Sequence, residues 1–163
     1  MEIKKLDERA DFFYATSGSA GADLRACSAH GERLEDGVEV IIPSGQTVMV
    51  GTGIALDLGS VSDTEDIGTK GELTFAAMVM PRSGLGCKQG LVPGNLVGLI
   101  DADYQGEIKV CLWNRGSEAQ TIRALDRIAQ LVIVPVFKPF FRVVEEFSRI
   151  TDRAEGGFGS SGK

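Results

Sequence analysis

The sequence has a single histidine, His30, and no Cys-x-x-Cys pair among its three cysteines, Cys27, Cys87 and Cys111. One histidine and scattered cysteines cannot form a Ser-His-Asp triad, a zinc-protease motif or a zinc ligand cluster. An odd number of cysteines that lie far apart in the chain also argues against a disulfide framework. We therefore expect reduced thiols and a cytoplasmic location.

Long apolar runs are also missing. The N-terminal residues Met1–Lys5 lead into no apolar segment, and no uninterrupted apolar run has the length that a bilayer requires. We expect neither secretion nor insertion into a membrane. The formal net charge of −6 predicts that the surface repels nucleic-acid polymers. A nucleotide could still be held by a few local arginines.

Helical periodicity does not extend beyond a turn or two, whereas short β-branched runs and turn residues recur throughout the 163 residues. This pattern predicts one all-β domain, a barrel or sandwich, with no internal repeat. The expected strands are Ala22–Ala26, Val38–Ile42, Gln46–Thr52, Ile54–Leu58, Leu73–Met80, Leu96–Ile100, Ile108–Leu112, Gln120–Ile122, Arg127–Val136 and Phe141–Glu145.

Several segments carry further expectations. The runs between Val38 and Leu58 predict a meander in which Gly53 separates two strands. Arg127–Val136 is apolar enough to be buried on both faces. The polar, acidic segment Gly59–Glu72 predicts an exposed loop or hairpin tip, and Pro81–Lys88 predicts a short irregular or one-turn helical segment.

The segment Gly94–Val110 contains the densest group of candidate functional residues. It predicts a β-hairpin whose turn, Asp101–Gly106, reverses at a glycine with positive φ. Asp101, Tyr104 and Asn95 would place an acid, an aromatic ring and an amide on this hairpin. Together they could hold a planar ligand and activate a water. Ordinary turn chemistry explains the same residues, because aspartates bond their own backbone in turns.

A calcium loop is excluded at this turn. Asp101, Asp103 and Gly106 imitate the first, third and sixth positions of such a loop, but Leu112 stands where a bidentate glutamate is required.

Other polar groups stand out from their surroundings. Arg82-Ser83-Gly84 combines a guanidinium, a hydroxyl and an approachable backbone, which suits a phosphate, although no Walker loop is present. Gln130 is an amide in an apolar strand, and either a structural bond or a ligand contact would satisfy it. Asp23 follows a Gly-rich entry and could be a strand-end acid.

The C-terminal segment Ile150–Lys163 has no packing periodicity. It is either a flexible end or a segment that folds over a ligand, with Phe158 on a ring and Arg153 and Ser160 on phosphates.

Five segments together resemble, in order, the five motifs of the trimeric dUTPase family, most closely its bacterial branch. They are Ser19–Ala26, Pro81–Gly86, Gly94–Val110, Arg127–Val132 and Arg153–Gly162, and the resemblance spans about residues 15–162. It implies a jelly-roll-like β-barrel over residues 1–150 and a flexible tail over residues 151–163. It also implies a homotrimer with active sites at the subunit interfaces, each closed by the tail of a neighbouring subunit.

The activity implied by this resemblance is hydrolysis of dUTP to dUMP and diphosphate. That reaction keeps dUTP low and supplies dUMP. Mg²⁺ would be held mainly by the substrate phosphates, with Asp23 bonding its waters. Asp101 would activate the water that attacks the α-phosphorus, and Ser83 would contact the leaving bridging oxygen. The other implied phosphate contacts are Arg82, Gly84, Gln130 and Arg153.

Base and sugar recognition follow from the same resemblance. Asn95, Leu99, Ile100 and the backbone near Lys109 would line the uracil pocket. Tyr104 would lie under the deoxyribose and exclude a 2′-hydroxyl. Phe158 would stack on uracil when the tail closes, with Gly159 and Ser160 beside it.

The sequence departs from the family pattern at Ala154, where glycine is usual, and at Cys87, where bacterial members often carry histidine. Three other functions stay open. One is a dCTP deaminase of the same fold, one is a nucleotide sensor without turnover, and one is a purely structural jelly roll.

Overall fold

The computed structural model describes residues 1–59, 71–152 and 154. The elements of this part of the chain are strands and one helical turn, η1 (Leu85–Gln89). The strands are β1 (Glu2–Lys5), β2 (Ala22–Arg25), β3 (Ser28–Ala29), β4 (Glu32–Arg33), β5 (Glu39–Ile42), β6 (Thr47–Asp57), β7 (Gly71–Met80), β8 (Leu91–Pro93), β9 (Gly98–Ile100), β10 (Glu107–Asn114), β11 (Gln120–Arg123) and β12 (Arg127–Pro139).

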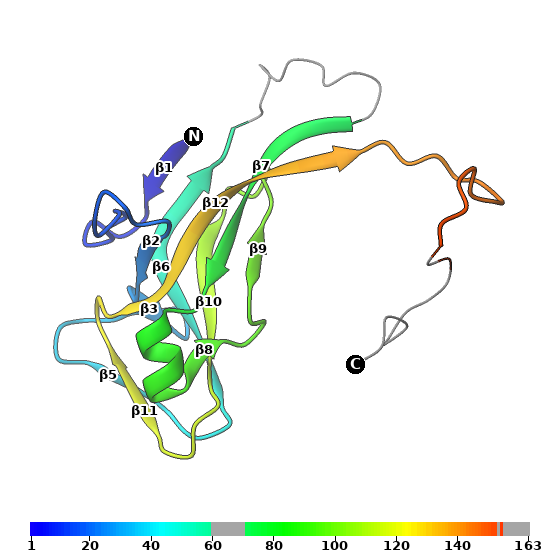
Figure 1. The fold of residues 1–163 in the computed structure, drawn as a ribbon. Coiled ribbons are helices and arrows are strands. Elements are labelled where there is room, and N and C mark those ends of the chain that lie inside the picture. Colours follow the sequence, from blue (N-terminus) through cyan, green and yellow to red (C-terminus); the bar gives the residue numbers. More distant parts are fainter. Residues whose placement is uncertain (60–70, 153, 155–163) are drawn as a thin grey trace.

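The strands form three antiparallel sheets (Figure 1). The largest has the order β4-β3-β6-β10-β8, with β1 paired to the far end of β6. A four-stranded sheet has the order β2-β12-β7-β9, and β5 pairs with β11 in a small third sheet. The prediction of an all-β domain is therefore confirmed.

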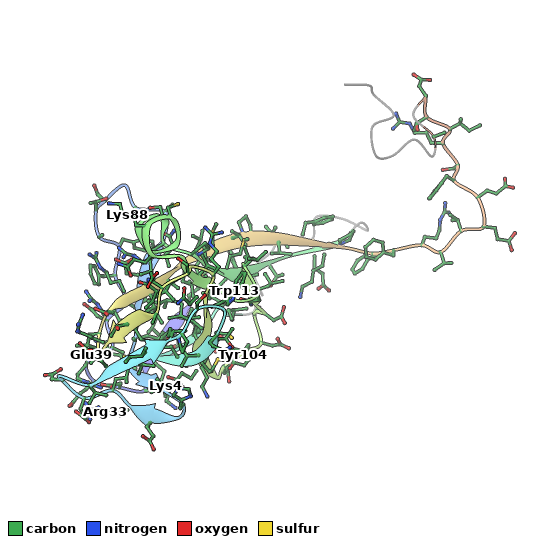
Figure 2. All side chains as sticks on the ribbon, turned by 90° about the horizontal axis from the view of Figure 1, so that it is seen from below. Lys4, Arg33, Glu39, Lys88, Tyr104 and Trp113 are labelled. Atoms are coloured by element: carbon green, nitrogen blue, oxygen red, sulfur yellow. The ribbon has the colours of Figure 1, made fainter. Side chains whose placement is uncertain are left out.

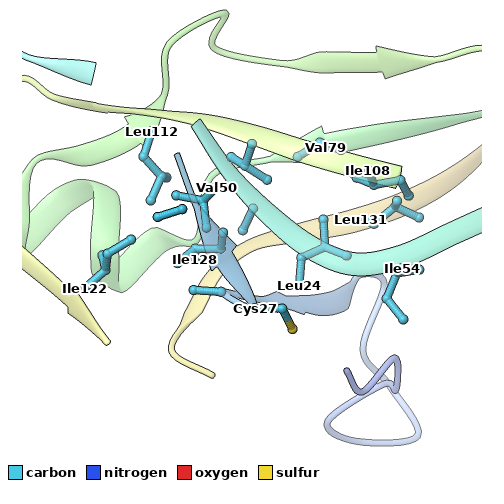
Figure 3. Packing of buried hydrophobic residues seen from close by; sticks show 14 of the residues in the cluster. Leu24, Cys27, Val50, Ile54, Val79, Ile108, Leu112, Ile122, Ile128 and Leu131 are labelled. Atoms are coloured by element: carbon cyan, nitrogen blue, oxygen red, sulfur yellow. The ribbon is translucent and has the colours of Figure 1, made fainter. Parts of the chain in front are cut away.

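The hydrophobic core lies between the two larger sheets (Figure 3). Strand β10 shows why its residues form a strand: Ile108, Val110 and Leu112 are buried, while the residues between them face outward. This alternation follows from the two-residue period of a pleated strand. Leu24 of β2 and Leu131 of β12 meet the same core from the opposite sheet.

The meander expected between Val38 and Leu58 is wrong. Strand β6 runs without a break through Gly53, and β5 belongs to a different sheet. Gly53 has a φ of 66°, which lets β6 bulge instead of ending. The bulge shifts the register of β10, so that Glu107 pairs with Ala55 whereas Lys109 pairs with Gly51.

The predicted hairpin at Gly94–Val110 is also wrong. Strand β9 pairs with β7 in the four-stranded sheet, whereas β10 pairs with β6 and β8 in the largest sheet. The segment between them therefore crosses from one sheet to the other. Strand β9 begins only at Gly98, because Leu96 takes a φ of 65° that ends extended structure. The glycine at the turn, Gly106, does not have the positive φ that we expected.

Strand β12 is buried less completely than predicted. Ile128, Ala129 and Leu131 are fully buried, but Arg127 is exposed, and the residues after Leu131 are half-buried or exposed. The reason is geometric: β12 extends to Pro139 with β7 as its partner, past the end of the core (Figure 1).

The strand predicted at Phe141–Glu145 does not form. Residues 140–152 instead run away from the body as an extended arm (Figures 1 and 2). Phe141 and Val143 are 89% and 97% exposed. Their alternating pattern suits a pleated surface, but no strand in the described part of this chain lies beside them.

The remaining local predictions agree with the structure. Strands β5, β7 and β11 lie at the expected segments, and η1 supplies the helical turn expected within Pro81–Lys88. Most of the predicted loop Gly59–Glu72, residues 60–70, lies outside the described residues. The three cysteines are unpaired. Within the described ranges, no helix combines the length and apolarity needed to cross a bilayer.

Candidate active site

Asp23 lies at the centre of one polar cluster. The Nε of Arg82 donates to its Oδ1 at 2.8 Å, and the Nη1 of Arg127 donates to its Oδ2 at 3.2 Å. The Asp23 side chain is only 10% exposed, so its charge is desolvated and requires these two cations. The sheet brings the residues together, because β12 lies between β2 and β7. We name Asp23, Arg82 and Arg127 the arginine cluster.

Gln130 lies beside the arginine cluster, paired with Asp23 on one side and Met80 on the other. Its Nε2 donates to the carbonyl of Pro81 at 3.0 Å. Gly21 packs against it so closely that a Cβ there would be 3.0 Å from the Gln130 Oε1. The structure thus supplies the structural bond that was one of the two alternatives for this amide.

Ser83 and Gly84 follow Arg82 at the start of the helical turn, and both are exposed. A Cβ built on Gly84 would meet no atom within 4 Å. Packing within this chain therefore does not require a glycine at position 84. Its effect is to leave the backbone beside Arg82 open to a ligand.

Asp101 lies in a different place, at the end of β9, in a pocket of about 410 Å³. We name it the acidic pocket. Leu99 also lines it, whereas Ile100 packs partly against the core. The full lining is Thr74, Phe75, Ala76, Leu99, Asp101, Ala102, Asp103, Val136 and Lys138.

The other residues expected to bind base and sugar, Tyr104, Asn95 and Lys109, are not among the residues that line this pocket. Tyr104 is 45% exposed, and its hydroxyl donates to the carbonyl of Glu107 at 2.9 Å. The Asn95 amide packs over Gly98, where a Cβ would be 3.3 Å from its Nδ2. Lys109 extends from β10 toward Glu107, with 3.8 Å between its Nζ and the Glu107 Oε2.

A single chain does not bring the two groups together. Asp101 and Ala76 line the same pocket, whereas Arg82 follows the end of β7 at Met80. The four steps along the strand from Ala76 to Met80 alone span about 13 Å at ~3.3 Å per residue. The arginine cluster and the acidic pocket are thus two partial sites at opposite ends of the β7–β9 pair.

Four predicted site residues, Arg153, Phe158, Gly159 and Ser160, lie outside the described residues. Ala154, one of the departures from the family pattern, has a φ of 40°. This is a left-handed conformation that glycine adopts more readily than alanine.

Sequence reasoning missed two cations. Arg127 was named only as the first residue of an apolar strand and of one of the five motifs, with no role of its own, and its pairing with Asp23 spans 104 residues. Lys138 lines the acidic pocket although it lies near the exposed end of β12. The sequence signals for Arg127 were its place at the start of a buried strand and of a family motif, and Lys138 had none.

Two side chains that pack around the Gly53 bulge have shifted pKa values. Hydrogen bonds from Arg9 lower the pKa of Asp7 to about 2, against an opposing effect of burial. Burial raises the pKa of the Cys27 thiol to about 11. Cys27 is therefore a protonated core residue near neutral pH rather than a nucleophile.

The fold and the two partial sites define an all-β protein in which two arginines converge on one carboxylate. The comparisons with known proteins make this more specific, because the family model for dUTPase matches residues 7–162. The chain belongs to the dUTPase family.

Curated relatives cover nearly the whole chain. A deoxyuridine 5'-triphosphate nucleotidohydrolase of Neisseria gonorrhoeae (strain NCCP11945) is 52% identical over 165 residues, which cover 99% of this chain and 96% of that protein. The protein of the same description from Idiomarina loihiensis is 51% identical, covering 100% and 97%.

Solved structures agree in fold. A mutant dUTPase of Staphylococcus bacteriophage 80alpha with dUpNHpp superimposes with a TM-score of 0.77 at 23% identity, covering 99% of this chain and 98% of that one. A dUTPase of phage phi11 of S. aureus, described with a structural Mg(II) ion, has a TM-score of 0.69 at 21% identity, covering 91% and 98%. These agreements support the jelly-roll-like barrel.

Proposed function

We propose that this protein is a dUTP diphosphatase that hydrolyses dUTP to dUMP and diphosphate. Membership of the dUTPase family and the activity named for relatives at about 50% identity support this. The observation that carries the mechanism is the presence of an arginine cluster and a separate acidic pocket on one fold.

The active enzyme is a homotrimer in this proposal, with each site shared between subunits. Two observations support it. One chain keeps Asp101 and Arg82 apart, so a complete site needs the arginine cluster of one subunit beside the acidic pocket of another. The arm formed by residues 140–152 also exposes large apolar side chains, which a neighbouring subunit would cover. The tail, residues 151–163, would then close a neighbour's site.

The arginine cluster would hold the phosphates. Arg82 and Arg127 already converge on one carboxylate, which shows that both guanidinium groups reach the same point. A triphosphate offers these planar donors stronger, bidentate acceptors. Ser83 and the open backbone at Gly84 would complete the contact at the bridging oxygen, where charge develops as diphosphate leaves. Gln130 and Arg153 would add further contacts to the phosphates.

Mg²⁺ fits this arrangement as an ion carried by the substrate. Mg²⁺ keeps several waters and prefers one or two carboxylates together with phosphate oxygens. Asp23 supplies one carboxylate beside the two phosphate-binding arginines, a donor set that suits contact through water. When bound, the ion would neutralise charge on the phosphates. Asp23 would orient its waters, and the arginines would turn from Asp23 to the phosphates.

Asp101 would activate the attacking water. A carboxylate at the edge of an open pocket is a suitable general base, because it needs only hydrogen-bond reach to a water in line with the α-phosphorus. Leu99, Ile100, Asn95 and the backbone near Lys109 would form the uracil pocket. Tyr104 would lie under the deoxyribose, and Phe158 would stack on the base.

The intracellular setting is proposed too. A cytoplasmic location is supported by three unpaired cysteines, of which Cys27 is buried with a raised pKa. The formal net charge of −6 argues against a nucleic-acid polymer as the partner, whereas local arginines can hold a free nucleotide.

The test is diphosphate release from dUTP, dCTP, dTTP and UTP, each with Mg²⁺ and with a chelator. We expect Mg²⁺-dependent release from dUTP alone. Ammonia release from dCTP would instead identify a deaminase. Tight binding of a non-hydrolysable dUTP analogue without any release would identify a nucleotide sensor, and no binding at all would leave a structural protein.

A further inference from the structure

The turn Asp101–Gly106 is held by side-chain hydrogen bonds to the strands beside it. The hydroxyl of Tyr104 donates to the carbonyl of Glu107 at 2.9 Å. The Gln105 amide donates to the Asp57 carboxylate at the end of β6 at 2.8 Å. These two hydrogen bonds attach the turn to β6 and β10 of the largest sheet, although the turn begins after β9 of the four-stranded sheet.

Gly106 leaves space for the ring of Tyr104. A Cβ at position 106 would lie 2.6 Å from the Tyr104 hydroxyl oxygen and 2.7 Å from the ring carbon that carries it. Gly106 does not have a positive φ, so its missing side chain matters for space rather than for backbone freedom. The ring of Tyr104 can pack against the turn only because residue 106 has no side chain.

Glu107 connects this ring to the bulge of β6. Its Oε1 accepts a hydrogen bond from the Gly53 backbone N–H at 2.9 Å, a group that the bulge removes from the β6–β10 ladder. The carboxylate also lies over Gly51, where a Cβ would be 2.5 Å from the same oxygen. The glycine at position 51 therefore makes room for the Glu107 side chain.

We propose that Glu107 is a positioning residue for sugar selectivity. Its carboxylate fixes the first residue of β10 on the Gly53 bulge, and its carbonyl thereby fixes the ring of Tyr104. This inference rests on the proposed function, in which Tyr104 excludes a 2′-hydroxyl. A ring that is no longer held in place stops excluding one extra oxygen, so Glu107 acts on selectivity without touching the substrate.

The test separates the effect of side-chain length at position 107 from the effect of side-chain charge. Glu107→Gln keeps an oxygen that accepts from the Gly53 N–H, whereas Glu107→Asp keeps the charge but is one methylene too short to reach it. We expect the ratio of kcat/KM for dUTP to kcat/KM for UTP to fall about fivefold in Glu107→Asp and to stay near wild type in Glu107→Gln. Tyr104→Phe removes the hydroxyl that donates to the Glu107 carbonyl, and it should lower this selectivity ratio as much as Glu107→Asp does. Combining Glu107→Asp with Tyr104→Phe should lower the selectivity ratio no further than either change alone.

A second readout does not depend on activity. The chain has two tyrosines, Tyr14 and Tyr104, so ¹⁹F NMR of fluorotyrosine-labelled protein gives two signals with Tyr14 as an internal control. The Tyr104 signal should broaden or shift in Glu107→Asp and not in Glu107→Gln. Unchanged selectivity and an unchanged Tyr104 signal in Glu107→Asp would overturn the proposal. Failure of the wild-type protein to hydrolyse dUTP would instead overturn the proposed function, and the NMR comparison would still decide the role of Glu107.

Discussion

At the scale of single residues, the two acids of the proposed site have different surroundings. Asp23 is nearly buried, and each of its oxygens accepts from an arginine. Asp101 lies in an open pocket, and within the described ranges no lysine or arginine forms an ion pair with it. Asp23 is therefore already committed to cations, while Asp101 can accept a hydrogen from a water. This difference supports assigning the base role to Asp101.

We expect Asp101→Asn to lower kcat for dUTP by about 10²–10⁴-fold while leaving substrate binding nearly intact, because an amide cannot take the proton from water. Asp103→Asn is the matched control, since Asp103 lines the same pocket and has no role in the proposed mechanism. Steady-state kinetics and binding of a non-hydrolysable dUTP analogue measure both effects. Near-normal kcat in Asp101→Asn, or an equal loss in Asp103→Asn, would contradict the assignment.

At the scale of elements, alternation in the sequence predicts which face of a strand is buried, but not which strand lies beside it. The pattern of Ile108–Leu112 was read correctly, whereas its expected partner Leu96–Ile100 pairs in another sheet. Gly53 was read as a break because glycine weakens strands, yet a bulge keeps β6 continuous. Motifs in the sequence were enough to name the candidate residues. The contact between Asp23 and Arg127 could not be predicted in this way, because it depends on which strands pair in the sheet.

The loop between β1 and β2 supports the β6 bulge, and its stability should depend on pH. Asp7 packs against Gly53 and is held by Arg9 and Arg33, and its pKa falls to about 2. A carboxylate whose folded-state pKa is lowered stabilises the fold above its unfolded pKa, and this contribution is lost as pH falls toward about 2. Asp7→Asn should therefore lower the urea midpoint at pH 7, and the difference from wild type should shrink below about pH 4.

Asp11→Asn, an exposed acid on the same loop, is the control and should leave the urea midpoint unchanged at every pH. A midpoint for Asp7→Asn that equals wild type at pH 7 would show that the Asp7–Arg9 pair does not stabilise the loop. A difference that stays constant down to about pH 2.5 would show that the effect is not electrostatic.

At the scale of the whole molecule, the arm is the feature that one chain cannot explain. Phe141, Val143, Phe147 and Ile150 are 89–97% exposed. Burying a large apolar side chain contributes about 1.5–3 kcal/mol, so covering these four on a neighbour would contribute roughly 6–12 kcal/mol before the entropy of ordering the arm is subtracted. This contribution supports a role for the arm in the subunit interface. The tail beyond it is rich in glycine and serine and offers little such area.

Two truncations separate the arm from the tail. Removing residues 140–163 deletes the apolar arm, and we expect the trimer to dissociate and activity to be lost. Removing residues 153–163 should preserve the trimer and abolish most activity, because the proposed contacts of Arg153, Phe158 and Ser160 are made to the ligand rather than to the core. Light scattering coupled to size exclusion measures the assembly, and diphosphate release measures activity. A longer truncation that stays trimeric would show that the arm does not hold the assembly, and a shorter one that dissociates would show that the tail is part of the interface instead of a lid.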